Sequence, residues 1–102
     1  DMTSTLANTA WILATAADDK LRDAPKALQH ARRAVELSKR EDPSILQVLA
    51  GAQAAAGEFD QAVATCVEAA KLARAKGNEG LAGSIEALQR QFEQKQPFRQ
   101  SR

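Results

Sequence analysis

Residues 54–73 read AAAGEFDQAVATCVEAAKLA, in which a glycine precedes an aromatic residue and small side chains follow. Ala62, Cys66 and Ala69 are spaced so that they lie on one face if the segment is helical. Soluble domains usually fill such a face with leucine or phenylalanine. Small residues there predict that a neighbouring helix approaches closely, as a stack of helical hairpins requires.

The rest of the sequence also favours helices, and no segment alternates between apolar and polar residues with the period of a strand. The breaks in the helical pattern fall at residues 18–25, 39–43, 57 and 76–80. We therefore expect five helices, over residues 4–17, about 25–38, 43–56, 59–76 and 81–95.

Aspartate and proline mark two of the expected helix starts. Asp23 and Asp42 can accept hydrogen bonds from first-turn amides, and a proline in that turn loses no hydrogen bond. Gly57 is expected to adopt the left-handed conformation that ends a helix. Residues 96–102, QPFRQSR, show no helical period, and we expect them to form a flexible tail.

Two parts of the chain are similar at a shift of 35 residues. The segment QHARRAVELSKR at 29–40 corresponds to ATCVEAAKLARA at 64–75. The paired positions are Ala27 with Ala62, Ala31 with Cys66, Ala34 with Ala69, Leu37 with Leu72, Leu46 with Leu81, and Ala50 with Ile85. One offset shared by two kinds of helix indicates a tandem repeat.

The second repeat reads Leu46-x2-Leu49-Ala50-x2-Gln53, then a turn at Gly57, then Ala62-x3-Cys66. This pattern resembles the tetratricopeptide repeat (TPR) family, whose signature is W-x2-L-G-x2-Y followed by A-x3-F and a proline. The resemblance implies an all-α helical-repeat array of two helix hairpins plus a C-terminal capping helix. The domain would cover residues 4–95, with repeats at about 4–40 and 43–76 and the capping helix at about 79–95.

The sequence departs from the family at four positions. Thr9 and Gln53 stand where large apolar residues are usual, and Ala31 and Cys66 replace an aromatic residue. These departures predict a thin core rather than a different topology.

In TPR proteins the first helix of each hairpin lines a concave surface. By resemblance, that surface would carry Ala7, Trp11, Ala14, Gln47, Gly51, Ala54, Ala82, Glu86 and Gln89. The resemblance thus implies a non-catalytic protein–protein interaction or scaffolding module that binds a peptide or helix there. These positions are mostly alanine and glycine, which disfavours the carboxylate clamp of lysine, asparagine and arginine found in some family members.

The alternative is a self-association or spacer segment of a larger multi-repeat protein. No charged residue occurs from Leu6 to Ala17, whereas a terminal repeat needs a polar outer face. Trp11 and Ile12 lie off the internal stripe of that helix. We therefore expect them to meet a second copy or an upstream repeat, and a homo-oligomer formed this way would be two-fold symmetric.

Composition and charge disfavour several other classes of protein. The net charge of +1 argues against a nucleic-acid binder, which also makes the RNA-reading pentatricopeptide repeat a poorer match than the TPR. The longest apolar run, LANTAWILATAA at 6–17, is too short and polar for a membrane span. A single cysteine excludes an internal disulfide.

No constellation of residues predicts an enzyme, a metal site or a cofactor. Cys66 is interpreted as a buried structural thiol, and His30, the only histidine, as an exposed helix residue. Asp18, Asp19 and Asp23 lack the spacing of a calcium loop and are interpreted as loop and capping residues.

Overall fold

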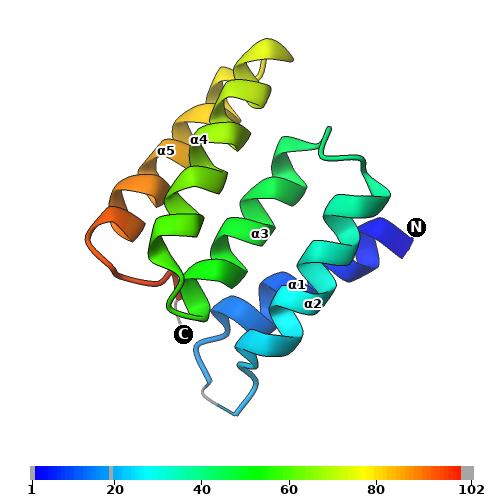
Figure 1. The fold of residues 1–102 in the computed structure, drawn as a ribbon, viewed down its shortest axis with the longest axis vertical. Coiled ribbons are helices and arrows are strands. Elements are labelled where there is room, and N and C mark those ends of the chain that lie inside the picture. Colours follow the sequence, from blue (N-terminus) through cyan, green and yellow to red (C-terminus); the bar gives the residue numbers. More distant parts are fainter. Residues whose placement is uncertain (1, 19, 100–102) are drawn as a thin grey trace.

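The computed structural model describes residues 2–18 and 20–99, and this part of the chain folds into five α-helices without any strand. The helices are α1 (Met2–Thr15), α2 (Ala24–Leu37), α3 (Pro43–Ala55), α4 (Phe59–Ala75) and α5 (Glu79–Glu93) (Figure 1). The all-α prediction is confirmed, and no observed helix end differs from its expected position by more than two residues.

The predicted capping residues begin their helices as expected. Asp23 Oδ1 accepts a hydrogen bond from the Lys26 amide at 3.1 Å, and Asp42 Oδ1 accepts one from the Ser44 amide at 2.9 Å. The sequence analysis missed a third cap, Asn78, which starts α5 in the same way. These bonds satisfy first-turn amides that have no partner inside a helix.

Two glycines end helices in the left-handed conformation. Gly57, predicted for this role, has a φ of +83°, and the following amide of Glu58 donates to the Gln53 carbonyl at 2.8 Å. Gly77 repeats the arrangement after α4 with a φ of +78°. The chain can therefore reverse direction within a few residues and return the next helix against the last one.

The helices pack in sequence order, and α3 is central. Each of the pairs α1–α2, α3–α4 and α4–α5 packs along much of its length, and α3 also contacts α1 and α2 (Figure 1). The surfaces that meet are lined by small residues with no solvent exposure: Ala10, Ala14, Ala27, Ala31, Ala34, Ala50, Ala62, Cys66, Ala69 and Ala73. The larger fully buried hydrophobic side chains are Leu46, Ile85 and Phe92.

The helix starts follow the 35-residue offset of the sequence to within one residue. Helix α2 begins at Ala24 and α4 at Phe59, while α3 begins at Pro43 and α5 at Glu79. The alanine and cysteine positions paired across the two segments are all buried. Leu37, in contrast, does not belong to the packed face and is 37% exposed. It is the last residue of α2, where the chain turns away toward α3, so the expected packing position is corrected.

Gln53, one of the departures from the family pattern, is accommodated by a polar partner. Its side chain is buried, and its Oε1 lies 2.7 Å from the hydroxyl of Thr65, which is also buried. The same hydroxyl lies 2.9 Å from the Gln61 carbonyl. A hydrogen bond across the α3–α4 contact therefore replaces the apolar packing that the family uses there.

The C-terminal segment was expected to form a flexible tail, but residues 97–99 lie against the helices. Phe98 packs beside Trp11, and the Gln91 side-chain amide donates to the Pro97 carbonyl at 2.9 Å. The sequence pattern missed this because the contact is between residues far apart in the chain and has no period. Residues 100–102 lie outside the described part of the chain.

Within residues 2–18 and 20–99, no helix combines the length and the apolar character that crossing a membrane requires.

The small residues of α4 provide the first testable prediction. Ala69 is fully buried, so Ala69→Leu should overpack the helix contacts and lower the free energy of unfolding by about 1–3 kcal/mol. The matched control is Ala64→Leu on the exposed side of the same helix, which should change stability by less than about 0.5 kcal/mol. Urea denaturation followed by circular dichroism measures both values. Equal tolerance at the two positions would contradict the packing of α4 described above.

Candidate functional site

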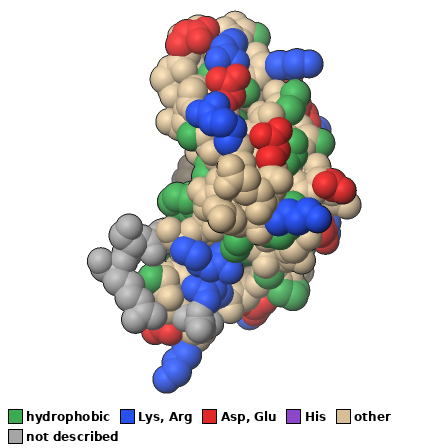
Figure 2. All heavy atoms as spheres, turned by 90° about the vertical axis from the view of Figure 1, so that its left-hand side faces the viewer, with side chains coloured by type: hydrophobic (Ala, Val, Ile, Leu, Met, Phe, Trp, Pro, Cys, Tyr) green, Lys and Arg blue, Asp and Glu red, His purple; other side chains and the backbone are tan. Residues whose placement is uncertain are grey.

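Two neighbouring hollows lie across α1, α3 and α5. One hollow of about 510 Å³ is lined by Asn8, Trp11, Ile12, Ser44, Gln47 and Val48. A second of about 330 Å³ is lined by Trp11, Gln47, Ser84, Ala87, Leu88, Gln91 and Phe98. Because they share Trp11 and Gln47, the two hollows form one continuous surface, which we call the Trp11 groove. Figure 2 shows the outline of the molecule indented on its left-hand side, with hydrophobic side chains at the indentation.

Gly51 positions Trp11 at the centre of the groove. A Cβ atom built on Gly51 would lie 2.7 Å from Trp11 Cζ3, which is closer than real Cβ atoms approach, and 3.3 Å from Cε3, which is tighter than most Cβ contacts. The missing side chain at Gly51 lets the indole ring lie directly on the backbone of α3. Trp11 is consequently half-buried within its own chain.

Phe98 completes the surroundings of Trp11. The two ring centroids are 5.5 Å apart and the ring planes are tilted by 31°, a favourable arrangement for an aromatic pair. The sequence analysis missed Phe98 and Gln91 as groove residues. The only available signal was the single aromatic residue of the otherwise polar segment at 96–102.

Of the residues expected on the concave surface, Trp11 and Gln47 line the groove. Glu86 and Gln89 are half-buried but do not line it. The remaining five are buried, and the expectation that they face an open surface is corrected: Ala7, Ala14, Gly51, Ala54 and Ala82.

The correction has a simple geometric cause. Helix α1 packs against both α2 and α3, and α3 packs against α1, α2 and α4. The buried arc of each first helix is therefore wider than a single stripe, and the small residues assigned to the concave surface fall inside it. The open side is displaced to the neighbouring positions of each helix, such as Asn8, Ser44 and Ala87.

Glu86 is instead engaged in an ion pair that links α4 to α5. Both of its oxygens lie 2.7 Å from the guanidinium nitrogens of Arg74, which also reaches Glu79 at 3.2 Å. The hydrogen bond from Arg74 lowers the pKa of the Glu86 carboxyl. On the other side of α4, Glu68 makes a similar two-pronged pair with Arg40 at 3.0 and 2.7 Å. These exposed pairs help to set the register of the helices and lie outside the groove.

Basic side chains gather where α1 ends. The Arg22 guanidinium donates to the carbonyls of Ala16 and Ala17, and that of Arg99 lies 3.4 Å from the Ala14 carbonyl. Partial burial, together with the charge of Arg22, lowers the pKa of Arg99. The terminal carbonyls of a helix carry partial negative charge, which favours cations at this position.

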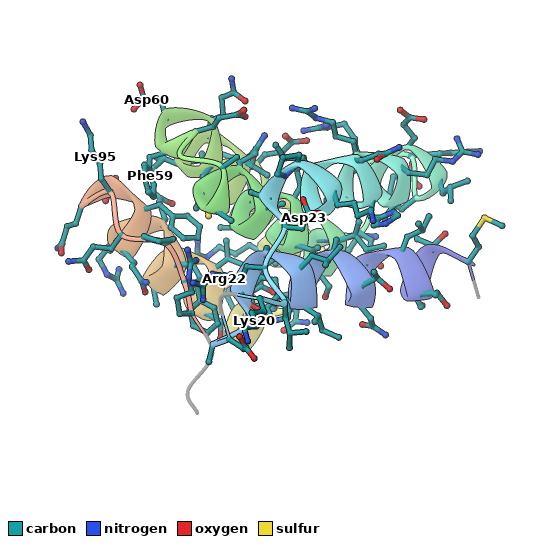
Figure 3. The ribbon with its side chains drawn as sticks, turned by 90° about the horizontal axis from the view of Figure 1, so that it is seen from below. Lys20, Arg22, Asp23, Phe59, Asp60 and Lys95 are labelled. Carbon is teal, nitrogen blue, oxygen red and sulfur yellow. The ribbon has the colours of Figure 1, made fainter. Side chains whose placement is uncertain are left out.

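A separate hollow of about 310 Å³ lies where α4 begins. It is lined by Gly57, Glu58, Phe59, Asp60, Gln61 and Lys95. Figure 3 shows Phe59, Asp60 and Lys95 on one side of the molecule, apart from Lys20, Arg22 and Asp23. It is smaller and more polar than the Trp11 groove and brings together no set of groups with evident chemistry.

The residues weighed for chemistry occupy structural positions. Cys66 is fully buried, and burial raises the pKa of its thiol to about 12. His30 is half-buried rather than exposed, in a shallow hollow on the side of α2 that also contains Leu6. Asp18 Oδ1 accepts from the Lys20 amide at 2.9 Å, while Asp19 lies outside the described residues. No three His, Cys, Asp or Glu side chains of the described part are grouped so that they could hold a metal ion.

Comparisons with family models, with curated proteins and with solved structures gave no match to this chain. The TPR resemblance therefore remains a hypothesis supported by the residues and helix boundaries given above.

The contact between Gly51 and Trp11 leads to a prediction with a definite sign. Alanine is favoured over glycine in a helix by about 1 kcal/mol, so Gly51→Ala should stabilise the chain by about that amount once Trp11→Ala has removed the ring. In the wild-type background the added Cβ would displace the ring, and Gly51→Ala should be neutral or destabilising. Chemical denaturation of the wild type, the two single variants and the double variant gives the coupling free energy between positions 11 and 51. We expect a value of about 1–3 kcal/mol.

The matched control for this cycle is Gly83→Ala in α5, where a new Cβ would meet nothing within 4 Å. It should stabilise both backgrounds alike, by up to about 1 kcal/mol. A coupling near zero between positions 11 and 51 would contradict the placement of the ring.

Proposed function

We propose that this chain is a non-catalytic protein-interaction module that binds a peptide or helix in the Trp11 groove. One observation carries the proposal: two open hollows join around Trp11 and Gln47 into a surface that spans three helices. A TPR-like stack of hairpins would present such a surface as its concave side, and the offsets of 35 residues between the starts of α2 and α4 and 36 between those of α3 and α5 support that arrangement.

The chemistry of the groove suits a polypeptide. Its lining combines apolar side chains with three amide side chains, those of Asn8, Gln47 and Gln91, and contains no charged residue. Amides can both donate to and accept from a peptide backbone, while the apolar residues can cover a ligand's side chains. Tryptophan is also among the residues that contribute most to protein interfaces. An uncharged lining does not favour nucleic acid or phosphate as the ligand.

A non-catalytic role agrees with the state of the reactive groups. The one thiol is buried, and its raised pKa keeps it protonated at neutral pH. The groove contains neither a carboxylate nor an imidazole that could act as a general base.

The test is a selection of peptides from a random display library on the full chain, followed by affinity measurement on variants. Ala87 is exposed and lines the groove, so Ala87→Glu places a charge where a bound peptide would cover it. We expect the selected peptides to bind this variant at least about tenfold more weakly, because the peptide would bury an unpaired carboxylate.

Ala64→Glu on the exposed side of α4 is the matched control and should leave affinity unchanged. Circular dichroism checks that both variants keep the helical fold. Enriched peptides that bind the Ala87→Glu and wild-type chains equally, or no enrichment at all, would refute peptide binding in the groove.

Self-association through α1 is a second candidate function, and the exposure of Ile12 favours it. This side chain is 51% exposed, next to Trp11 on a helix without charged residues. If a second copy covers it, sedimentation should show a concentration-dependent dimer at micromolar protein, and Ile12→Lys should shift the chain to monomer. Val67→Lys, at an exposed apolar position of α4, is the control and should leave the dimer intact. A monomer throughout the concentration range would exclude this candidate.

A further inference from the structure

We infer that the partner of the Trp11 groove is an extended peptide that places an aromatic residue on Trp11, and that residues 96–99 of this chain are its intramolecular competitor. The inference rests on the proposed function and specifies the ligand that the groove selects.

The chain's own segment packs on Trp11 at the edge of the second hollow, as part of a bound peptide could. It has no regular secondary structure, and Phe98 contributes to the lining of the second hollow. Two groove residues and the end of α1 each hold one feature of it: Trp11 packs on the Phe98 ring, Gln91 Nε2 donates to the Pro97 carbonyl, and the Ala14 carbonyl lies 3.4 Å from the Arg99 guanidinium. An aromatic platform, an amide aimed at a ligand carbonyl and a helix C-terminus therefore act on three successive residues.

The segment is attached so that it can leave. Helix α5 ends at Glu93, and Lys95 then turns the chain with a φ of 60°, a conformation that non-glycine residues rarely adopt. Beyond that turn, the contacts that hold Pro97, Phe98 and Arg99 come mainly from side chains. An irregular segment held by a few side-chain contacts opens more readily than the helical core. Figure 1 shows it crossing from the end of α5 back toward the end of α1.

The segment also leaves part of the groove uncovered. The first hollow, between Asn8, Ile12, Ser44 and Val48, receives no residue from it. A longer peptide could place its aromatic side chain on Trp11 in place of Phe98 and extend along this free part. The longer peptide could bind only those molecules in which the segment is undocked, and its apparent affinity would fall in proportion to that fraction. Releasing the segment should therefore strengthen binding.

The chain's single tryptophan makes the competition directly measurable. The probe is a synthetic nonapeptide with the sequence of residues 94–102, QKQPFRQSR, added to the full-length chain carrying Phe98→Ala. Removing the Phe98 ring should shift the Trp11 emission to longer wavelength, and the peptide should reverse that shift in a saturable manner. The wild-type chain should respond at least about tenfold more weakly, because its own segment competes.

Two controls isolate the aromatic contact. The same peptide with alanine in place of its phenylalanine should produce no response. Phe59→Ala removes a half-buried aromatic residue that does not line the groove, and it should leave the Trp11 emission as in the wild type. If Phe98→Ala loses helical structure, Pro97→Gly is used instead, because it frees the segment entropically while leaving the groove lining intact.

The outcomes separate this inference from the proposed function. If Phe98→Ala does not alter Trp11 emission, or the nonapeptide does not bind the released groove, the inference is wrong. Library peptides could also be weakened by Ala87→Glu and yet lack an aromatic residue and bind the Phe98→Ala and wild-type chains equally. This result would refute the inference but support the proposed binding of a peptide in the groove. Binding of the nonapeptide with no library peptide enriched on either the wild-type or the Phe98→Ala chain would uphold the intramolecular contact and refute binding of a separate partner.

Discussion

The close approach of helices at alanine and cysteine is the constraint on which the rest of this structure depends. Ala27, Ala31 and Ala34 of α2, and Ala62, Cys66 and Ala69 of α4, have no solvent exposure. Each buries little apolar area, so the stability of the fold must come from many tight contacts rather than from a few large side chains. Such packing has no space for a larger residue and little capacity to relax when one is introduced.

The same principle creates the candidate site. Gly51 has only a hydrogen atom as its side chain, so the ring of Trp11, the largest side chain of the protein, lies directly on the backbone of α3. Trp11 is thereby fixed by one face of α3 while part of its ring remains accessible. A leucine or alanine at position 51 would have filled the space and moved the ring. The groove is thus a direct consequence of how closely α1 approaches α3.

Local features of the fold could be predicted from the sequence, because they depend on neighbouring residues. Asp23, Asp42 and Gly57 determine helix ends through hydrogen bonds and backbone conformation within a few residues. The buried alanines of α2 and α4 follow from helical periodicity. Helical periodicity did not reveal which positions line the open side of the groove. The width of the buried face of a helix depends on how many other helices pack against it. The Gln53–Thr65 pair and the docked Phe98 join distant segments, and no pattern within a segment reveals them.

The thin core and the occupied groove are physically related. A fold whose interior is largely alanine has few large side chains that could cover its apolar surface. Trp11 would be more exposed if α3 were its only contact. The chain limits that exposure with Phe98, which comes from the irregular segment that follows α5. A cover of this kind protects an apolar surface without sealing it. Any partner that displaces Phe98 must make an apolar contact with Trp11 that is at least as favourable as the one Phe98 makes. The residue that contacts Trp11 is therefore the most important one for binding.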